Sequence, residues 1–497
     1  MKANKLTQTL FNQINHYGLV LYFIIPYILF LKFFQVHFQF DYRDFFWGFK
    51  NSIIQSGLTA SFVTLLSVPL SLGLFRLSSK QLGVVRKLLL IPQILPALFS
   101  ILIAFSIFKP FPMGTIGIVL VFSLVHLGYS VLKINLAIQE KLGSSCLIAD
   151  VFGIGSIDFY KQIYFPLLKT DLLTNFVLIF TFCFSSFSIP LVAGGGLGTN
   201  LEVLIYEKIF IAQDWSTAWV YSGIQSLFIF FLSWFFLRKK EQAASSFVLT
   251  NRLISTWSLL FVLLYLALYL GGYLWGITHA LSSLHQLAEF YSDLWQASWV
   301  SLKGLMLFLM FCFVLLFLLI FDLVGYRRHS FVSHLISPST ILVSFVFYLL
   351  FPQTAGFDTI KMVLAMSILF FPSLYKSFIE RPLTQLQDQL LIAEVFGLSK
   401  MQMVVDVVLR QIKKPILLWM SFLIVWFLSD FAVQRALGNQ SQTVGLLAEG
   451  FLSSYRLSLA YLISFYILVF WFVVVAVLYF ILEVFHVIYK KFIFKIR

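Results

Sequence analysis

Residues 147–153 read Leu-Ile-Ala-Asp-Val-Phe-Gly, and residues 391–397 read Leu-Ile-Ala-Glu-Val-Phe-Gly. The two heptapeptides differ at a single position, where Glu394 takes the place of Asp150, and they lie 244 residues apart in a chain of 497. A match of this length at almost half the chain length indicates an internal repeat. The sequence therefore predicts a protein built from two related halves.

The residues around the repeats are strongly apolar. The chain is 60% hydrophobic and 11% charged, whereas about a quarter of the residues in a soluble domain are charged. A single aqueous core cannot bury this much apolar surface, so lipid must solvate most of it. The composition predicts an all-α polytopic membrane protein, and the lipid bilayer is one of its partners.

Apolar windows of about twenty residues mark the segments that can cross a bilayer as helices. About twelve are predicted, near 18–36, 52–75, 88–108, 114–135, 170–193, 216–237, 253–276, 297–324, 335–352, 359–378, 412–434 and 460–488. The first shows no convincing cleavage site and is interpreted as an uncleaved span. Four spans precede each heptapeptide within its half and two follow it. An even number of spans per half makes the two six-helix halves parallel.

Basic residues gather in the loops that follow even-numbered spans, for example at Arg86 and Lys87 and at 238–240. Lys and Arg are retained on the cytoplasmic side of membrane proteins. Both termini are therefore expected on the cytoplasmic side of the membrane. The net charge of +14 is explained by these clusters, and no basic face with interleaved aromatic residues suggests nucleic acid.

The domain boundaries follow from the repeat. Residues 1–237 form the first half, 238–252 a polar cytoplasmic linker, and 253–497 the second half. Each half contains one long cytoplasmic loop, at about 136–169 and 379–411. Both loops alternate apolar and polar residues at helical spacing, so they are expected to be structured.

No catalytic or metal-binding constellation is visible in the sequence. Cys146, Cys183 and Cys312 are far apart and lack the spacing of metal ligands or of a disulfide framework, and the histidines show no paired spacing within one helix. The glycine-rich run 194–198 lacks the Lys-Ser/Thr of a phosphate loop. The sequence therefore gives no sign of an active site, and no cofactor is expected in this chain.

The two loops resemble the cytoplasmic loop of importer-type ABC permeases. That motif runs Glu-Ala-Ala, three residues, Gly, nine residues, then Ile-x-Leu-Pro. In the first loop Ala149 and Gly153 match it, and Ile163 and Pro166 close it in register. In the second loop Ala393 and Gly397 match, Val407 and Leu409 fall at the Ile and Leu positions, and Arg410 replaces the proline. The motif's glutamate is absent from both loops, where Leu147 and Leu391 stand.

The resemblance implies the type-1 ABC importer permease fold and a coupling role for both loops. It also implies a transport subunit that is not itself an enzyme, in the inner membrane of a bacterium. A short helix that ends at glycine can turn sharply, and its apolar residues can occupy a groove on a partner. The implied partners are two copies of an ATPase that carries ATP and Mg²⁺, and a periplasmic or lipid-anchored substrate-binding protein. The coupling residues by this resemblance are Ala149, Asp150, Val151, Phe152, Gly153, Ile163, Pro166, Ala393, Glu394, Val395, Phe396 and Gly397.

Further matches narrow the type of permease. Residues 199–206 look like the outer loop before the last span of a half in thiamine and ferric-iron permeases, and 443–446 with 453–456 occupy the comparable place. The chain resembles fused thiamine-type permeases best, which implies thiamine or its phosphates as substrate, with ferric iron as the alternative. Ser185, Ser186 and Asp430 are candidates for the substrate path. An ion-coupled secondary transporter is the alternative from another class, but it needs ionisable residues deep in the spans, where this chain has few.

Overall fold

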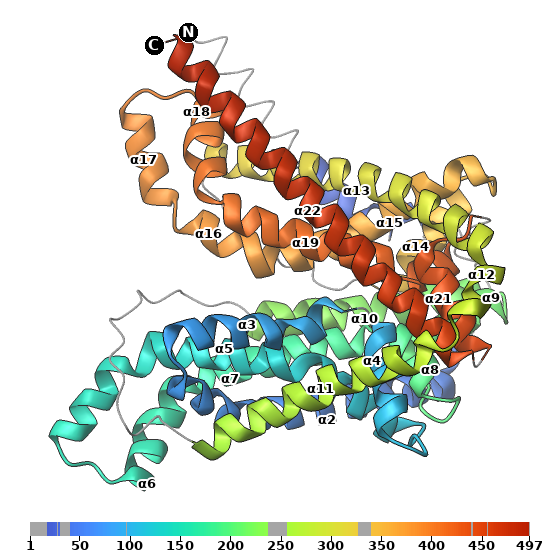
Figure 1. Ribbon diagram of the computed structural model, residues 1–497, viewed down its shortest axis with the longest axis horizontal. Coiled ribbons are helices and arrows are strands. Elements are labelled where there is room, and N and C mark those ends of the chain that lie inside the picture. Colours follow the sequence, from blue (N-terminus) through green and yellow to red (C-terminus); the bar gives the residue numbers. More distant parts are fainter. Residues whose placement is uncertain are drawn as a thin grey trace. The chain divides into compact units, whose positions relative to one another are not determined.

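The computed structural model describes residues 17–26, 28–29, 40–95, 97–236, 256–326, 339–438, 441–454 and 456–496. Throughout these ranges the regular structure is helical, and no strand occurs in them (Figure 1). Helices satisfy every backbone N–H and C=O group within one segment, which lipid cannot do. The all-helical prediction is therefore confirmed for the described residues.

The chain forms two compact units, and each combines residues from both sequence halves. One unit is Phe34–Ser282. The other consists of Ser283–Arg497 together with Met1–Phe33. The units therefore do not coincide with the two sequence halves. The first helix of each half packs in the unit formed by the rest of the other half.

The unit Phe34–Ser282 is built around α2 (Tyr42–Gly73), which packs along α5 (Thr115–Val151) and α7 (Phe165–Phe184). Its other helices are α3 (Ser79–Ile94), α4 (Ala97–Ile107), α6 (Ser156–Asp158), α8 (Ser188–Ala193), α9 (Leu201–Phe210), α10 (Trp215–Phe236) and α11 (Thr256–Leu281).

Helix α11 is tied into this unit by two tyrosines. Tyr265 Oη donates a hydrogen bond to the Leu124 carbonyl at 2.7 Å, and Tyr269 Oη lies 2.9 Å from Ser100 Oγ. At the end of α2 the backbone approaches α11 so closely that a Cβ atom on Gly73 would lie 2.4 Å from the Leu259 nitrogen. This approach is possible only without a side chain at residue 73.

The second unit is built around α13 (Tyr291–Tyr326), which packs against α15 (Ala355–Leu374) and α19 (Lys413–Ser429). The helix Tyr17–Pro26 joins it through Tyr22, whose hydroxyl lies 2.5 Å from Ser367 Oγ. The other helices of this unit are α12 (Leu284–Glu289), α14 (Thr340–Leu350), α16 (Glu380–Thr384), α17 (Gln387–Val395), α18 (Lys400–Gln402), α20 (Ala432–Ala436), α21 (Val444–Ser453) and α22 (Leu457–Ile496).

Charged residues inside a span are paired where α15 begins. Lys361 is fully buried, and its Nζ atom lies 2.9 Å from Asp358 Oδ1 and 3.1 Å from Gln353 Oε1. The second carboxylate oxygen of Asp358 accepts a hydrogen bond from the Ser441 N–H at 2.9 Å. The buried charges thus compensate each other and anchor the segment before α21.

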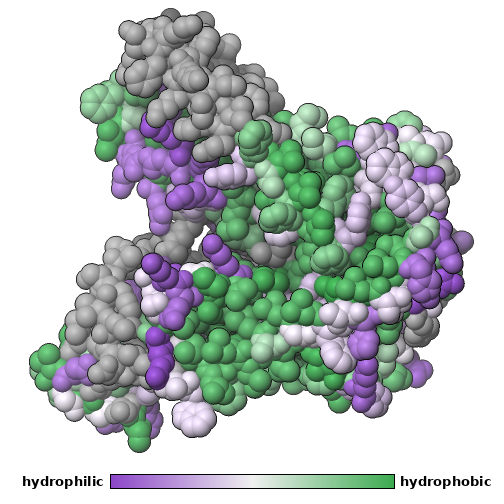
Figure 2. All heavy atoms as spheres, viewed as in Figure 1, coloured by the Kyte–Doolittle hydropathy of each residue, from purple (hydrophilic) through white to green (hydrophobic). Residues whose placement is uncertain are grey.

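Among the described residues, eight helices are long and apolar enough to cross a membrane, and ten are if each of two bent helix pairs counts as one span. On the face shown in Figure 2, apolar side chains cover the lengths of helices and hydrophilic ones gather toward their ends. The predicted spans 18–36 and 335–352 are not among the ten. The first lies partly outside the described residues, and the second contains only the 11-residue helix α14.

The predicted span 170–193 needs a correction at both ends. Helix α7 begins at Phe165 and ends at Phe184, and the separate short helix α8 follows it. The apolar window concealed this break because residues 185–193 are also mostly apolar.

We predict that Gly73→Ala destabilises the unit Phe34–Ser282 by about 1–3 kcal/mol, because the added methyl group overpacks the contact with α11. The thermal midpoint of the purified protein in detergent measures the effect. Gly57→Ala in the same helix is the matched control, since a Cβ atom there meets nothing within 4 Å. Equal midpoints for the two variants would contradict the close approach of α11 to α2.

Candidate functional site

The first heptapeptide ends helix α5 with a tight reversal of the chain at Gly153. Gly153 has a φ of 61°, in the left-handed region. The Gly153 N–H donates to the Asp150 carbonyl at 3.2 Å, and the Ile154 N–H donates to the Ala149 carbonyl at 2.9 Å. This pair of hydrogen bonds is the Schellman motif, which satisfies carbonyl groups at a helix end.

The second heptapeptide repeats this geometry at the end of α17. Gly397 has a φ of 75°, and its N–H donates to the Glu394 carbonyl at 2.9 Å. The Leu398 N–H donates to the Ala393 carbonyl at 3.1 Å. The repeat read from the sequence is therefore also a repeat of local structure.

After each reversal the chain returns along the helix that it has just left. In the first loop Ala149 is fully buried in a cluster with Leu142, Cys146, Phe159 and Tyr164. In the second loop the residues 244 positions later are likewise buried, namely Leu386, Leu390, Ala393, Met403 and Val408. The buried positions of the two loops are thus in register, and the alanine of the motif belongs to a packed core.

The apolar residues that immediately precede each glycine point away from that core. Val151 and Phe152 are 83% and 76% exposed, and Val395 and Phe396 are 86% and 79% exposed. Burying one such side chain contributes about 1.5–3 kcal/mol. Four further exposed apolar residues extend these surfaces and were not predicted from the sequence. They are also paired at an offset of 244: Ile148 with Ile392, and Ile157 with Met401. We call the two sets of four the first and second apolar surfaces.

Each return segment contains a stretch of π-helix, a local widening that is frequent at functional sites. The first is η3 (Phe159–Tyr164) and the second is η7 (Met403–Leu409). Ile163 lies partly buried against the core of the first loop. Pro166 lies in the first turn of α7, where the missing N–H costs nothing.

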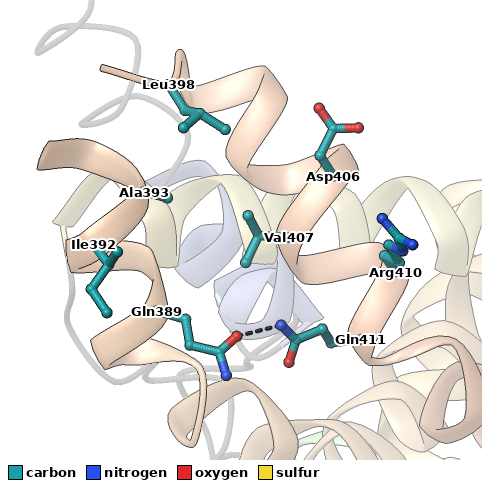
Figure 3. Close-up of a pocket in the computed structure, with 8 residues that line it drawn as sticks. All are labelled: Gln389, Ile392, Ala393, Leu398, Asp406, Val407, Arg410 and Gln411. Atoms are coloured by element: carbon teal, nitrogen blue, oxygen red, sulfur yellow. Dashed lines mark hydrogen bonds between the residues drawn. The ribbon is translucent and has the colours of Figure 1, made fainter. Parts of the chain in front are cut away.

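The second loop has a pocket of about 570 Å³ between α17 and η7 (Figure 3). The Gln411 amide donates to Gln389 Oε1 across it. Asp406 lines it from η7, and Arg410 lines it from the position directly after η7. At the corresponding positions the first loop has Ser145, Gln162, Pro166 and Leu167, so the charges of this pocket belong to the second loop alone.

The candidate substrate-path residues lie at breaks between helices. Ser185 follows α7, and its hydroxyl donates to the Thr181 carbonyl at 2.9 Å. The Ser186 carbonyl accepts from Asn200 Nδ2 at 2.7 Å. In the other unit Asp430 follows α19, and its Oδ2 atom accepts from the Val433 N–H at 2.9 Å. The Asp430 side chain therefore caps the N-terminal end of α20.

Within the described ranges, no three His, Cys, Asp or Glu side chains lie close enough together to hold a metal ion. The three cysteines are buried and form no disulfide bond. His126 is buried beside Gln93, with its Nδ1 atom 3.2 Å from Oε1, and stacks on Phe182. These residues pack the bundle and form no cluster of ligands.

These features define an all-helical, multi-pass membrane protein with apolar residues exposed on a matched pair of helix ends. Two bacterial proteins are similar to it. The thiamine transport system permease protein of Salmonella typhimurium is 24% identical over 354 residues, or 66% of either chain. That of Haemophilus influenzae is 29% identical over 156 residues, or 29% of either chain. The chain therefore matches less than two thirds of the length of each relative. No family model and no solved structure matches it.

We predict that Gly153→Ala and Gly397→Ala loosen their loops, because an L-residue in the left-handed region costs roughly 1–2 kcal/mol. Hydrogen exchange followed by mass spectrometry should show amides at the helix end exchanging about 5–30 times faster. Gly155→Ala is the control, since Gly155 is exposed and has no positive φ. Unchanged exchange in both variants would mean that the reversals do not need glycine.

Proposed function

We propose that this chain is the permease subunit of an ATP-driven importer, with two parallel six-helix halves that move a small solute by alternating access. The observation that carries the proposal is the pair of apolar surfaces. Each is exposed, each lies next to a Schellman turn, and the two correspond residue by residue. Matched surfaces in one chain suit a partner present in two copies.

For the first loop, the mechanism follows from how its surface is built. Val151 and Phe152 stand on a helix end whose other face is packed through Ala149, so a force applied to them passes into α5. Helix α5 is continuous from Thr115 to Val151 and includes a candidate membrane span. A partner that grips the helix end in a groove can therefore move the span as a rigid lever.

The partner proposed for these surfaces is an ATPase subunit, bound in two copies, one at each loop. ATP and Mg²⁺ bind to that subunit and not to this chain. A binding protein, periplasmic or lipid-anchored, delivers the solute at the opposite face. The basic clusters support a bacterial inner membrane location with both termini in the cytoplasm.

The solute proposed first is thiamine or one of its phosphates. It is supported by the printed names of the two relatives and by the motif resemblance. Ferric iron, the alternative solute, is supported by the motif resemblance alone. An ion-coupled secondary transporter remains the alternative from another class. The buried pair Asp358–Lys361 is the kind of group that it would need, but these two charges already compensate each other at 2.9 Å.

We predict that Val151→Asp with Phe152→Asp abolishes binding of the ATPase at the first loop, because a carboxylate cannot be buried in an apolar groove without a large desolvation cost. The pair Val395→Asp with Phe396→Asp should do the same at the second loop. Each double variant should recover at least tenfold less ATPase when the complex is purified from native membranes. ATP hydrolysis by the purified complex is the second readout.

The matched control is Ile211→Asp, an equally exposed apolar residue between α9 and α10, at the other end of α7 from the first loop. It should leave ATPase recovery unchanged. Full recovery of the ATPase with both double variants would contradict the importer proposal and favour the secondary transporter.

We further predict that Asp430→Asn lowers thiamine uptake about tenfold while the fold stays intact. The thiazolium ring of thiamine is a cation, and loss of a carboxylate partner costs about 1.5–3 kcal/mol. Asparagine keeps an oxygen that can cap α20. Uptake of labelled thiamine by cells that depend on this system is the measurement, with the exposed Asp293→Asn as control. Unchanged uptake would place Asp430 outside the substrate path.

A further inference from the structure

Lys303 occupies a defined depth on α13. The run 304–321 that follows it contains no charged residue and is about 27 Å long as a helix, close to the thickness of the hydrocarbon core. Trp299 and Trp295, both exposed, lie one and two turns from Lys303 on the side away from this run. Trp residues gather where hydrocarbon meets lipid headgroups. Lys303 therefore lies at the level of the lipid phosphates.

Beside Lys303, a groove of about 550 Å³ runs between α13 and α15. Apart from Lys303 it is lined mainly by apolar side chains, including Met306 and Leu307 of α13 and Ile360 of α15, each more than 40% exposed in the whole chain. Both walls are candidate membrane spans. A groove that opens between two spans below the phosphate level is filled by an acyl chain, because water cannot solvate it there.

The polar end of the groove is positive. Lys303 Nζ lies 5.4 Å from the centre of the Trp299 ring, a cation–π distance that holds the ammonium group at the groove. Gly356, in the first turn of α15, lines the same end. The side chain of Thr354, at the N-cap of α15, makes no capping hydrogen bond, so the N-terminal amides of α15 add to the positive potential. Among the described residues no carboxylate lines the groove, since Asp358 is buried against Lys361.

We propose that this groove is a binding site for one anionic phospholipid. The lipid phosphate binds between Lys303 and the N-terminus of α15, and one acyl chain lies along Met306, Leu307 and Ile360. The site depends on the spans alone and holds whether or not the chain is an importer.

Only the second half carries this site. Ser52 Oγ accepts a hydrogen bond from the Leu201 N–H at 2.8 Å, and Ser301 Oγ accepts one from the Val444 N–H at 3.0 Å. Leu201 and Val444 are the first residues of α9 and α21, so the two serines mark equivalent places on α2 and α13. Two residues further on, α2 has Ile54 where α13 has Lys303. Without a cation the first half cannot hold a phosphate there, and one lipid is expected per chain.

Native mass spectrometry of the full chain, purified in detergent and mixed with phosphatidylglycerol, tests the proposal. One phosphatidylglycerol should stay bound at collision energies that remove all others, and phosphatidylethanolamine with the same chains should not. Lys303→Gln should weaken this retained binding at least tenfold. Lys50→Gln is the matched control, because Lys50 is an exposed lysine on the equivalent helix α2 and lines no part of the groove. It should leave the retained lipid in place.

A second variant separates the groove from the charge. Met306→Trp fills the groove at an exposed position and keeps Lys303, and it should also lose the retained lipid. Glycerol phosphate, which has the phosphate but no acyl chain, should not bind. Retention of phosphatidylglycerol by Lys303→Gln as strongly as by the unchanged chain overturns the proposal. Binding of glycerol phosphate as tight as that of the lipid also overturns it, since the site would then take free phosphate.

Discussion

The packing of both loops depends on one backbone constraint, the left-handed conformation of Gly153 and Gly397. An L-residue with a side chain resists this conformation because its Cβ atom crowds the following carbonyl group. With glycine there, α5 and α17 can end and the chain can return along them, which brings Phe159 and Tyr164 against Ala149 in the first loop. The same reversal leaves the residues just before each glycine on the outside. Burial of one face and exposure of the other are thus two results of a single turn.

A second constraint is the scarcity of water within the spans, which obliges buried polar groups to find protein partners. Several of these polar side chains form hydrogen bonds with the backbone of segments that connect two helices, and not with other spans. Gln55 Nε2 donates to the Gly198 carbonyl at 2.9 Å, and Asn51 Nδ2 donates to the Thr199 carbonyl at 3.0 Å. In the other unit the Asp358 carboxylate accepts a hydrogen bond from the Ser441 N–H at 2.9 Å. In both units polar residues of a span therefore fix the start of a short helix, which is α9 before α10 in one unit and α21 before α22 in the other.

The two loops share the turn at glycine and the apolar surface beside it, but they differ in the charged residues nearby. Arg410 and Asp406 line a pocket in the second loop, whereas Pro166 and Gln162 stand in the first. A proline at the start of α7 fixes its first turn and offers no donor, while an arginine presents several. If the proposed ATPase binds in two identical copies, each copy meets different charged residues beside a similar apolar surface. The lipid groove at Lys303 shows the same relation between the halves, since α2 has Ile54 at the equivalent place.

The sequence by itself determined the membrane class, the repeat and the position of both turns. These features are local: mean apolarity over twenty residues, a heptapeptide match, and a glycine that ends a helix are all readable without neighbours. Tertiary structure decided which apolar residues stay exposed, because Ala149 and Val151 are both apolar in the sequence and only packing separates them. It also decided that α11 packs with the first half, through a contact at Gly73 that joins residues far apart along the chain. The break between α7 and α8 escaped prediction for the same reason, since hydropathy measures solvent preference and carries no information on where a helix bends.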